Sequence, residues 1–296
     1  MRNPAKKNRP REAVTPSQIP VRRWREVFLR VKDKAAADNL SIITAGVAFY
    51  HFLAIFPTIA AFVSIFGLIT SPAELQTYLH IIESVLPTEA LNLIKSELQR
   101  IIDTQGSRLG WGALCGTLLT LWSGAKAMIA MFAAMNVIYD EKEKRGFIGL
   151  RLTALSMALG VIVFVILALG LIVGLPLRSL VIGEAAPLIK YLRWPLLAGC
   201  CIVFLAVLYR YGPSRGEPQW RWVTPGAVGA TAVWLVGSAL FSFYVTHFSS
   251  YNITYGSLAV VVILMIWFYL SAYSILLGAE INAAIERQSS TGHNRG

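Results

Sequence analysis

Six long apolar runs dominate this sequence and constrain its fold more than any other feature. They cover residues about 42–69, 110–137, 152–176, 191–211, 223–247 and 256–278. A helix needs about 20 residues to cross the hydrocarbon core of a bilayer, which is about 30 Å thick. The alternating pattern of a β-barrel strand does not occur in them. The runs therefore predict an all-α, polytopic membrane protein with six transmembrane helices.

The composition supports lipid as the solvent for much of the chain. Apolar residues make up 55% of the 296 residues and charged residues 15%, and the mean hydropathy is +0.57. A soluble domain carries about 25% charged residues and could not bury this much apolar surface in one core. Cys115, Cys200 and Cys201 fall inside apolar runs, so we interpret them as small buried hydrophobes and not as a disulfide framework or zinc site.

Basic residues are distributed unevenly between the two sides that six crossings would create. Residues 1–41, 138–151, 210–222 and the C-terminal tail carry 20 of the 27 Lys and Arg residues. The positive-inside rule then places both termini in the cytoplasm and predicts a multi-pass protein of the bacterial inner membrane. This asymmetry accounts for most of the net charge of +11, so we expect no nucleic-acid partner.

The segments outside the runs have their own patterns. Residues 1–20 form a basic, Pro-rich tail that we expect to be disordered. In 21–41, apolar residues at helical spacing alternate with Arg and Lys, which predicts an amphipathic helix on the anionic inner leaflet. The transmembrane domain follows at 42–286, and 287–296 is a cytoplasmic tail. Within the first outer loop, 70–109, two apolar stripes predict two short amphipathic helices that cap or pack on the bundle.

Polar residues within or near the runs are the first candidates for a substrate site. A charge such as Lys126 costs on the order of 2.5–3.5 kcal/mol at the bilayer centre. Lys126 should therefore hold an anionic head group or a carboxylate, with Glu280 as the candidate partner, or else snorkel to the membrane rim. Tyr50 and His51 precede Pro57, which should kink or break the helix, as at transporter substrate sites. The alternative is a histidine bonded to a backbone carbonyl beside a static kink.

A second candidate lies between the fifth and sixth runs, at the predicted outer mouth. Residues 249–257 are uncharged and rich in hydroxyl groups. Tyr251, Asn252, Tyr255 and Gly256 could bind a ligand there. They could equally form a tight interfacial turn with tyrosines of the aromatic belt.

Two further patterns concern helix contacts. Gly112/Gly116 and Gly170/Gly174 are GxxxG pairs, which allow close contact within the bundle or in a homo-oligomer.

Asn136, Tyr139 and Asp140 end the second run. We expect them to cap it and to pair with Arg145 or Arg151 in a structural role.

Several segments resemble the YihY/BrkB family of bacterial inner-membrane proteins. They are 220–226, 249–257, 277–283, 48–50 with 56–57, 121–123, 136–140 and 209–213. The stretch Tyr251-Asn252-Ile253-Thr254-Tyr255-Gly256-Ser257 is the most specific, and the resemblance covers roughly residues 25–287. The family was once labelled ribonuclease BN. The resemblance implies a membrane protein linked to the cell envelope, with lipid or solute transport suggested.

The functional hypothesis is a transporter or lipid-handling protein whose partners are membrane lipids, including anionic head groups. A scaffold that does not transport is the first alternative, and a membrane-bound ribonuclease is disfavoured. The four histidines lack metal-ligand spacing, and no acidic cluster, P-loop or dinucleotide fingerprint occurs. We therefore expect no enzymatic activity, no metal and no cofactor.

Overall fold

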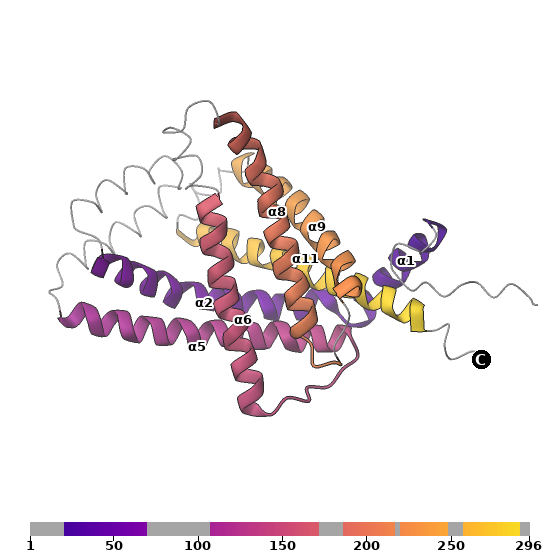
Figure 1. The fold of residues 1–296 in the computed structure, drawn as a ribbon, viewed down its shortest axis with the longest axis horizontal. Coiled ribbons are helices and arrows are strands. Elements are labelled where there is room, and N and C mark those ends of the chain that lie inside the picture. The colour runs from indigo at the N-terminus through magenta and orange to yellow at the C-terminus, as the bar shows by residue number, and fades with distance from the viewer. Residues whose placement is uncertain (1–20, 70–106, 172–185, 217–219, 248–256, 291–296) are drawn as a thin grey trace, which may run out of the picture.

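The computed structural model describes residues 21–69, 107–171, 186–216, 220–247 and 257–290, and every regular element there is a helix (Figure 1). The helices are α1 (Val21–Ala37), α2 (Leu40–Ile69), α5 (Ser107–Ile138), α6 (Phe147–Leu169), α8 (Ala186–Tyr211), α9 (Trp220–His247) and α11 (Ser257–Ser290). All of these except α1 contain a segment long and apolar enough to cross a membrane. The predicted all-α fold with six apolar spans is confirmed. The basic tail and the outer-loop helices lie outside the described residues.

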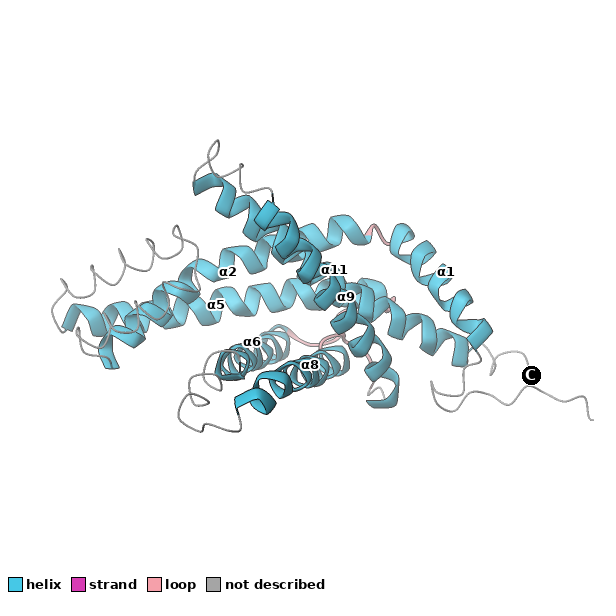
Figure 2. Ribbon diagram, turned by 90° about the horizontal axis from the view of Figure 1, so that it is seen from above, coloured by secondary structure: helices cyan, strands magenta, loops and turns pink. Residues whose placement is uncertain are grey.

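The long helices form two groups that pack across each other. Helices α2 and α5 pack side by side as a hairpin, and α6 and α8 pack together at a steep inclination to it (Figures 1 and 2). Helix α9 packs on α8, and α11 contacts α9, α2 and α5. Because α11 touches both groups, it joins them into one body. Helix α1 packs on α11, so the N-terminal helix and the end of α11 lie at the same end of the bundle.

The amphipathic helix and the first span are separated by a two-residue joint. Helix α1 ends at Ala37, and α2 starts at Leu40. Asn39 has a φ of 51°, in the left-handed region that asparagine tolerates better than most residues. Val27 and Val31 are buried on one face of α1 against Ala284 and Ile285. The structure therefore contains a helix where 21–41 predicts one, but this helix ends at Ala37, before residue 41.

Helix α11 extends well beyond residue 278, where the apolar run ends. It continues to Ser290 because Ala279, Ala283 and Ile285 are buried against neighbouring helices. Since the last turns pack on protein, they need no apolar face toward lipid. The length of the apolar run therefore underestimates the length of α11, and Glu280 lies inside this helix.

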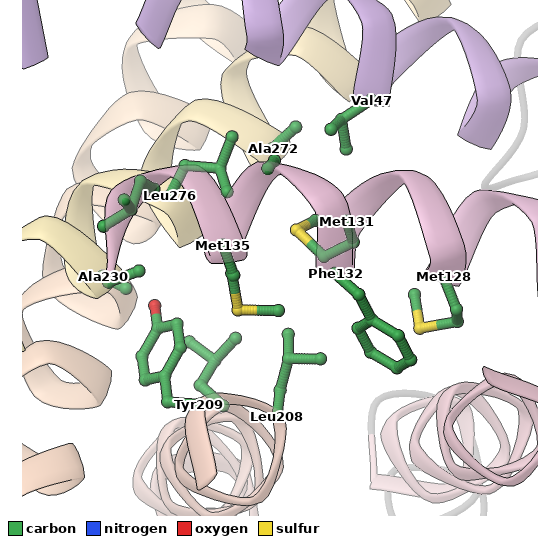
Figure 3. Packing of buried hydrophobic residues seen from close by; sticks show 14 of the residues in the cluster. Val47, Met128, Met131, Phe132, Met135, Leu208, Tyr209, Ala230, Ala272 and Leu276 are labelled. Atoms are coloured by element: carbon green, nitrogen blue, oxygen red, sulfur yellow. The ribbon is translucent and has the colours of Figure 1, made fainter. Parts of the chain in front are cut away.

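The hydrophobic core occupies the end of the bundle where the two helix groups meet (Figure 3). It is built from the last turns of α5 and α8 with the first part of α2 and the second half of α11, as Met131, Met135, Tyr209, Val47 and Leu276 illustrate. Tyr209 is fully buried and its hydroxyl donates to the carbonyl of Ile275 at 2.7 Å.

Helices α9 and α11 approach each other through two glycines. A Cβ atom on Gly278 would overlap the Tyr209 hydroxyl and the Gly226 carbonyl, and one on Gly226 would overlap the Gly278 carbonyl and Asn282. Glycine is needed at both positions because the two backbones are in direct contact.

The helices also expose many apolar side chains on their outward faces. Ile166 on α6 and Phe243 on α9 are both 62% exposed, and Val203 on α8 is 64% exposed. Such a surface is expected where a helix faces lipid, because hydrocarbon is as apolar as the side chains themselves.

Candidate functional site

A cationic pocket lies on the surface between α5 and α6. Its volume is about 280 Å³, and its polar lining comes from Lys126 and Arg151. The remaining lining side chains are Leu118, Leu121, Trp122, Ala125, Ile129 and Leu155. Two positive charges thus lie beside an apolar wall in a chain that crosses a membrane.

Each of the two cations lies over the face of an aromatic ring. Lys126 Nζ lies 3.8 Å from the ring centroid of Trp122, and Arg151 Cζ lies 4.2 Å from that of Phe147. A cation over an aromatic face gains about 0.5–2 kcal/mol, but the ring carries no compensating charge. Within the described residues, no carboxylate forms a salt bridge with either cation. The pocket therefore retains its positive charge.

Small residues bring the two walls of the pocket together. The Cβ position of Gly124 on α5 lies 3.4 Å from Cβ of Ala158 on α6, so the helices cross in close contact. Lys126 follows two residues later, near the middle of the apolar segment Leu114–Ile138. Arg151 comes in the second turn of α6, which starts at Phe147. An amphiphile could place its acidic group between the cations and its chain along the leucines.

Tyr50 and His51 do not line this pocket. The Nδ1 atom of His51 lies 2.8 Å from the carbonyl oxygen of Val47, one turn earlier on α2. This is the backbone-bonded histidine of the alternative interpretation. Tyr50 is 44% exposed and packs edge-on against Phe49. The structure therefore does not bring Tyr50, His51 and Lys126 into one site.

Pro57 leaves α2 continuous, because the helix runs from Leu40 to Ile69 without ending at the proline. The Pro57 carbonyl accepts a hydrogen bond from the Thr120 hydroxyl at 2.6 Å. This bond ties α2 to α5 and indicates a packing role for this position.

Glu280 lies in a different place from Lys126. It is 1% exposed and lines a pocket of about 360 Å³ between α1 and α11, which shares no residue with the pocket of Lys126. The candidate pairing of Lys126 with Glu280 is therefore not formed. Tyr251, Asn252, Tyr255 and Gly256 lie outside the described residues.

The GxxxG pairs are described only in part. Gly170 ends α6, and a Cβ atom there would meet nothing within 4 Å. Gly112 and Gly116 lie in α5, and Gly174 is not among the described residues.

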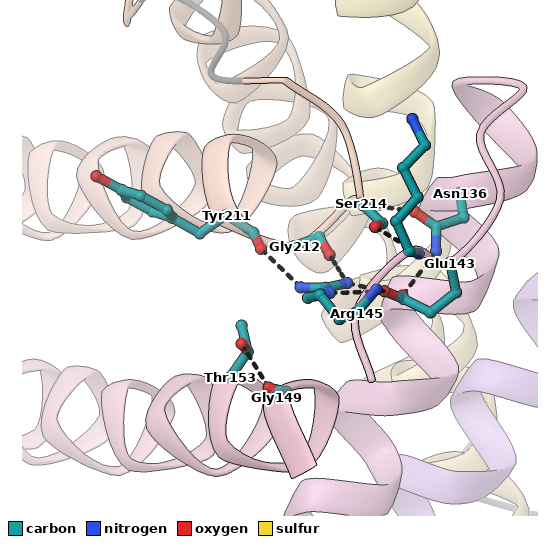
Figure 4. Close-up of polar contacts among 9 residues, drawn as sticks. Asn136, Glu143, Arg145, Gly149, Thr153, Tyr211, Gly212 and Ser214 are labelled. Carbon is teal, nitrogen blue, oxygen red and sulfur yellow. Dashed lines mark hydrogen bonds and ion pairs between the residues drawn. The ribbon is translucent and has the colours of Figure 1, made fainter. Parts of the chain in front are cut away.

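A polar network joins the turn after α5 to the turn after α8 (Figure 4). The Asn136 side chain donates to Glu143 at 3.0 Å and accepts from the Ser214 amide at 2.7 Å. Arg145 donates to Glu143 at 2.8 Å and to the carbonyl of Gly212 at 2.7 Å. The arginine therefore satisfies a carbonyl that the end of α8 leaves free.

The charge of Glu143 is strongly stabilised by this network. Hydrogen bonds from the Arg145 side chain, opposed by desolvation and assisted by Asn136, lower the pKa of the Glu143 carboxyl to about 2.

A second network surrounds Arg215, beyond α8. Arg215 pairs with Glu286 at 2.5 Å and lies 3.8 Å from the ring centroid of Tyr139. Burial raises the pKa of the Tyr139 phenol, so the ring stays neutral. Arg215 therefore links the end of α8 to the end of α11.

A third set of charges holds α1 against the bundle. Lys34 Nζ lies 3.0 Å from Asp38 Oδ1 and 3.0 Å from Asp140 Oδ1. Arg287 donates to Asp140 at 2.6 Å and to the carbonyl of Ile138 at 2.8 Å. The expected pairing of Asp140 with Arg145 or Arg151 is wrong, because the Asp140 carboxylate forms its ion pairs with Lys34 and Arg287.

The arginines Arg145 and Arg215 and the amide Asn282 were not among the predicted site residues. Their long-range contacts, from Arg145 to Gly212, from Arg215 to Glu286 and from Asn282 to Gly226, join residues more than 50 positions apart, and local sequence gives no signal for such contacts. Among the described residues, no group of three or more His, Cys, Asp or Glu side chains could hold a metal ion.

Six helices long and apolar enough to cross a membrane, with many apolar side chains exposed along them, define a polytopic α-helical membrane protein. A family model described as virulence factor BrkB matches residues 31–296. The chain belongs to this BrkB family, as its resemblance to YihY/BrkB sequences predicted.

Curated relatives agree with this membership. The chain is 32% identical to the ribonuclease-like protein YfkH of Bacillus subtilis over 253 residues, which are 83% of this chain and 90% of that protein. It is 27% identical to a UPF0761 membrane protein of Pseudoalteromonas translucida over 90% of this chain and 86% of the relative. No solved structure matches the chain.

Proposed function

We propose that this protein binds an anionic amphiphile of the cell envelope in the pocket between α5 and α6 and moves it within or across the bacterial inner membrane. The observation that carries the proposal is that Lys126 and Arg151 line the same pocket, beside six apolar or aromatic side chains. The acidic head group would neutralise two cations in a medium where an uncompensated charge is costly. The acyl chain would lie along Leu118, Leu121 and Leu155.

The proposal places both termini in the cytoplasm. The excess of Lys and Arg at the end shared by α1 and the end of α11 supports this orientation. Arg151, four residues into α6, would then lie near the inner leaflet, with Lys126 deeper in the bilayer.

The proposal includes no enzymatic activity. The ribonuclease-like name belongs to the Bacillus subtilis relative. Purified protein incubated with structured RNA should leave it intact. RNA cleavage that is lost in a Lys126→Ala variant would contradict this part of the proposal.

A reconstitution experiment tests the function. Vesicles with purified protein and a fluorescent phosphatidylglycerol are treated with a reducing agent that bleaches only the outer leaflet. We expect faster lipid movement than in empty vesicles, and loss of the excess rate in Lys126→Ala/Arg151→Ala. Lys142→Ala is the matched control because it removes an exposed cation outside the pocket. Movement no faster than in empty vesicles would count against the proposal.

A further inference from the structure

Two buried carboxyl groups meet where α1, the α1–α2 joint and α11 come together. Glu280 is 1% exposed, and the side chain of Asp38 is 11% exposed. The two carboxyls lie within hydrogen-bonding reach of each other. Oε1 of Glu280 and Oδ2 of Asp38 are both buried, and neither accepts a hydrogen bond from any donor in the described part of the chain.

Two ionised carboxylates cannot satisfy each other, because both are hydrogen-bond acceptors only. Burying such an oxygen without a donor is costly, and two like charges in contact repel. One proton removes both problems, because it converts one carboxyl into a donor for the other. We infer that Asp38 and Glu280 share one proton and that the α1–α11 junction is a proton-binding site.

The charges around the pair agree with one bound proton. The charged or titratable side chains that face it are Arg30, Asp33 and Lys34 from α1, Arg287 from α11, and Tyr139 and Asp140 after α5. The opposite charges of Arg30 and Asp33 cancel in the count, and the Tyr139 phenol is neutral. Lys34 and Arg287 then face three carboxyls, those of Asp38, Asp140 and Glu280. A single shared proton makes this set neutral. Helix α2 contributes no Asp, Glu, Lys or Arg.

The position of the pair gives the proton a mechanical consequence. Asp38 lies directly after α1, and Glu280 lies on the helix against which α1 packs. When the proton leaves, two negative charges face each other across the contact between α1 and α11. Repulsion then weakens the docking of α1, which otherwise depends on Val27, Val31 and the pairs formed by Lys34. The proton-binding site at the α1–α11 junction goes beyond the proposed function, since it does not involve the pocket of Lys126.

Hydrogen exchange measured by mass spectrometry on the full chain in nanodiscs tests the inference. After correction for the intrinsic exchange rate, we expect protection of α1 to fall as the pH rises from acidic to alkaline. In Glu280→Gln the amide donates permanently to Asp38, so protection should no longer depend on pH. Asp33→Asn is the control, because it lines the same pocket without belonging to the pair, and it should behave as the wild type.

Infrared spectroscopy of the same samples provides a second readout that does not depend on α1. The wild type should show a protonated-carboxyl band at neutral pH that disappears in both Glu280→Gln and Asp38→Asn and persists in Asp33→Asn. Protection of α1 that is independent of pH in the wild type, or a band that survives both substitutions, would overturn the shared proton. Neither readout requires lipid movement, so the inference can fail while the proposed function stands.

Discussion

The backbone amide of Gly226 on α9 donates a hydrogen bond to the side chain of Asn282 on α11 at 2.7 Å. The amide group of Asn282 donates in turn to the carbonyl of Val223 at 3.1 Å. One buried side chain thus satisfies a donor and an acceptor of the neighbouring helix, at the place where two glycines bring the backbones into contact.

Substitution of Asn282 by Leu should destabilise the folded protein. It leaves the Gly226 amide and the Val223 carbonyl buried without these partners, which costs about 1–3 kcal/mol for each unsatisfied group. Thermal unfolding in detergent measures the effect as a lower Tm. Thr153→Val serves as the control, because that exposed hydroxyl bonds only within its own helix. An unchanged Tm for Asn282→Leu would contradict the bridging role.

Gly278→Ala should be among the most disruptive single-methyl changes in the chain. The added carbon overlaps the Tyr209 hydroxyl and the Gly226 carbonyl, so α9 and α11 must separate. Overpacking of this kind costs about 1–3 kcal/mol or more. The measurement is the fraction of protein that remains monodisperse after mild heating.

Gly199→Ala is its matched control on α8, since a Cβ atom there meets nothing within 4 Å. Alanine is a better helix former than glycine, so this variant should be as stable as the wild type or slightly more stable. Equal behaviour of the two variants would mean that α9 and α11 are not in backbone contact.

Tyr209→Phe should cost about 1 kcal/mol, because it removes the hydrogen bond to Ile275 from a fully buried ring and leaves the apolar contacts in place. Tyr211→Phe, two residues later and 48% exposed, should change little. Chemical denaturation of both variants in the same detergent makes the comparison. A larger loss of unfolding free energy for Tyr211→Phe than for Tyr209→Phe would contradict this role of the Tyr209 hydroxyl.

Stability should decrease when the pH is lowered into the acidic range. The pKa of Glu143 is about 2 in the folded protein against an ordinary value of 4.5. The folded state therefore binds fewer protons than the unfolded state in this interval. The contribution of Glu143 is complete above about 4.5 and is lost as the pH falls toward about 2.

The pH dependence of Tm in Glu143→Gln should be flatter than in the wild type below 4.5. Glu141→Gln is the control, because in the described part of the chain the Glu141 carboxylate pairs with the exposed Lys144 alone. If Glu141→Gln flattened the curve and Glu143→Gln did not, the assignment of the acid-sensitive group would be wrong.

The sequence predicted the fold better than the site. Apolar runs identify spans because lipid imposes one length and one polarity on every crossing helix. The helical spacing of apolar residues in 21–41 likewise predicted a helix, although its Val27 and Val31 pack on α11 and were expected on the lipid surface. The uninterrupted apolar run ends before Glu280 and so stopped short of the last turns of α11, where Ile285 packs against α1.

The candidate site was only partly predictable for a related reason. Lys126 was recognisable because a charge within an apolar run is rare, but its neighbour Arg151 comes from another helix and looked like a juxtamembrane charge. Glu280 and Asp38 are 242 positions apart in the sequence, so nothing local indicates that they meet. His51 illustrates a different difficulty. A polar residue in a span can form its hydrogen bond within its own helix, so its presence there does not by itself indicate a site.

The most direct test of the central claim is lipid binding to the purified protein, measured by native mass spectrometry with phosphatidylglycerol and phosphatidylcholine in competition. We predict that the wild type retains the anionic lipid preferentially and that Lys126→Ala/Arg151→Ala loses this preference while Lys142→Ala keeps it. Equal retention of the two lipids by the wild type, or an unchanged preference in the double variant, would contradict a binding site for anionic amphiphiles between α5 and α6.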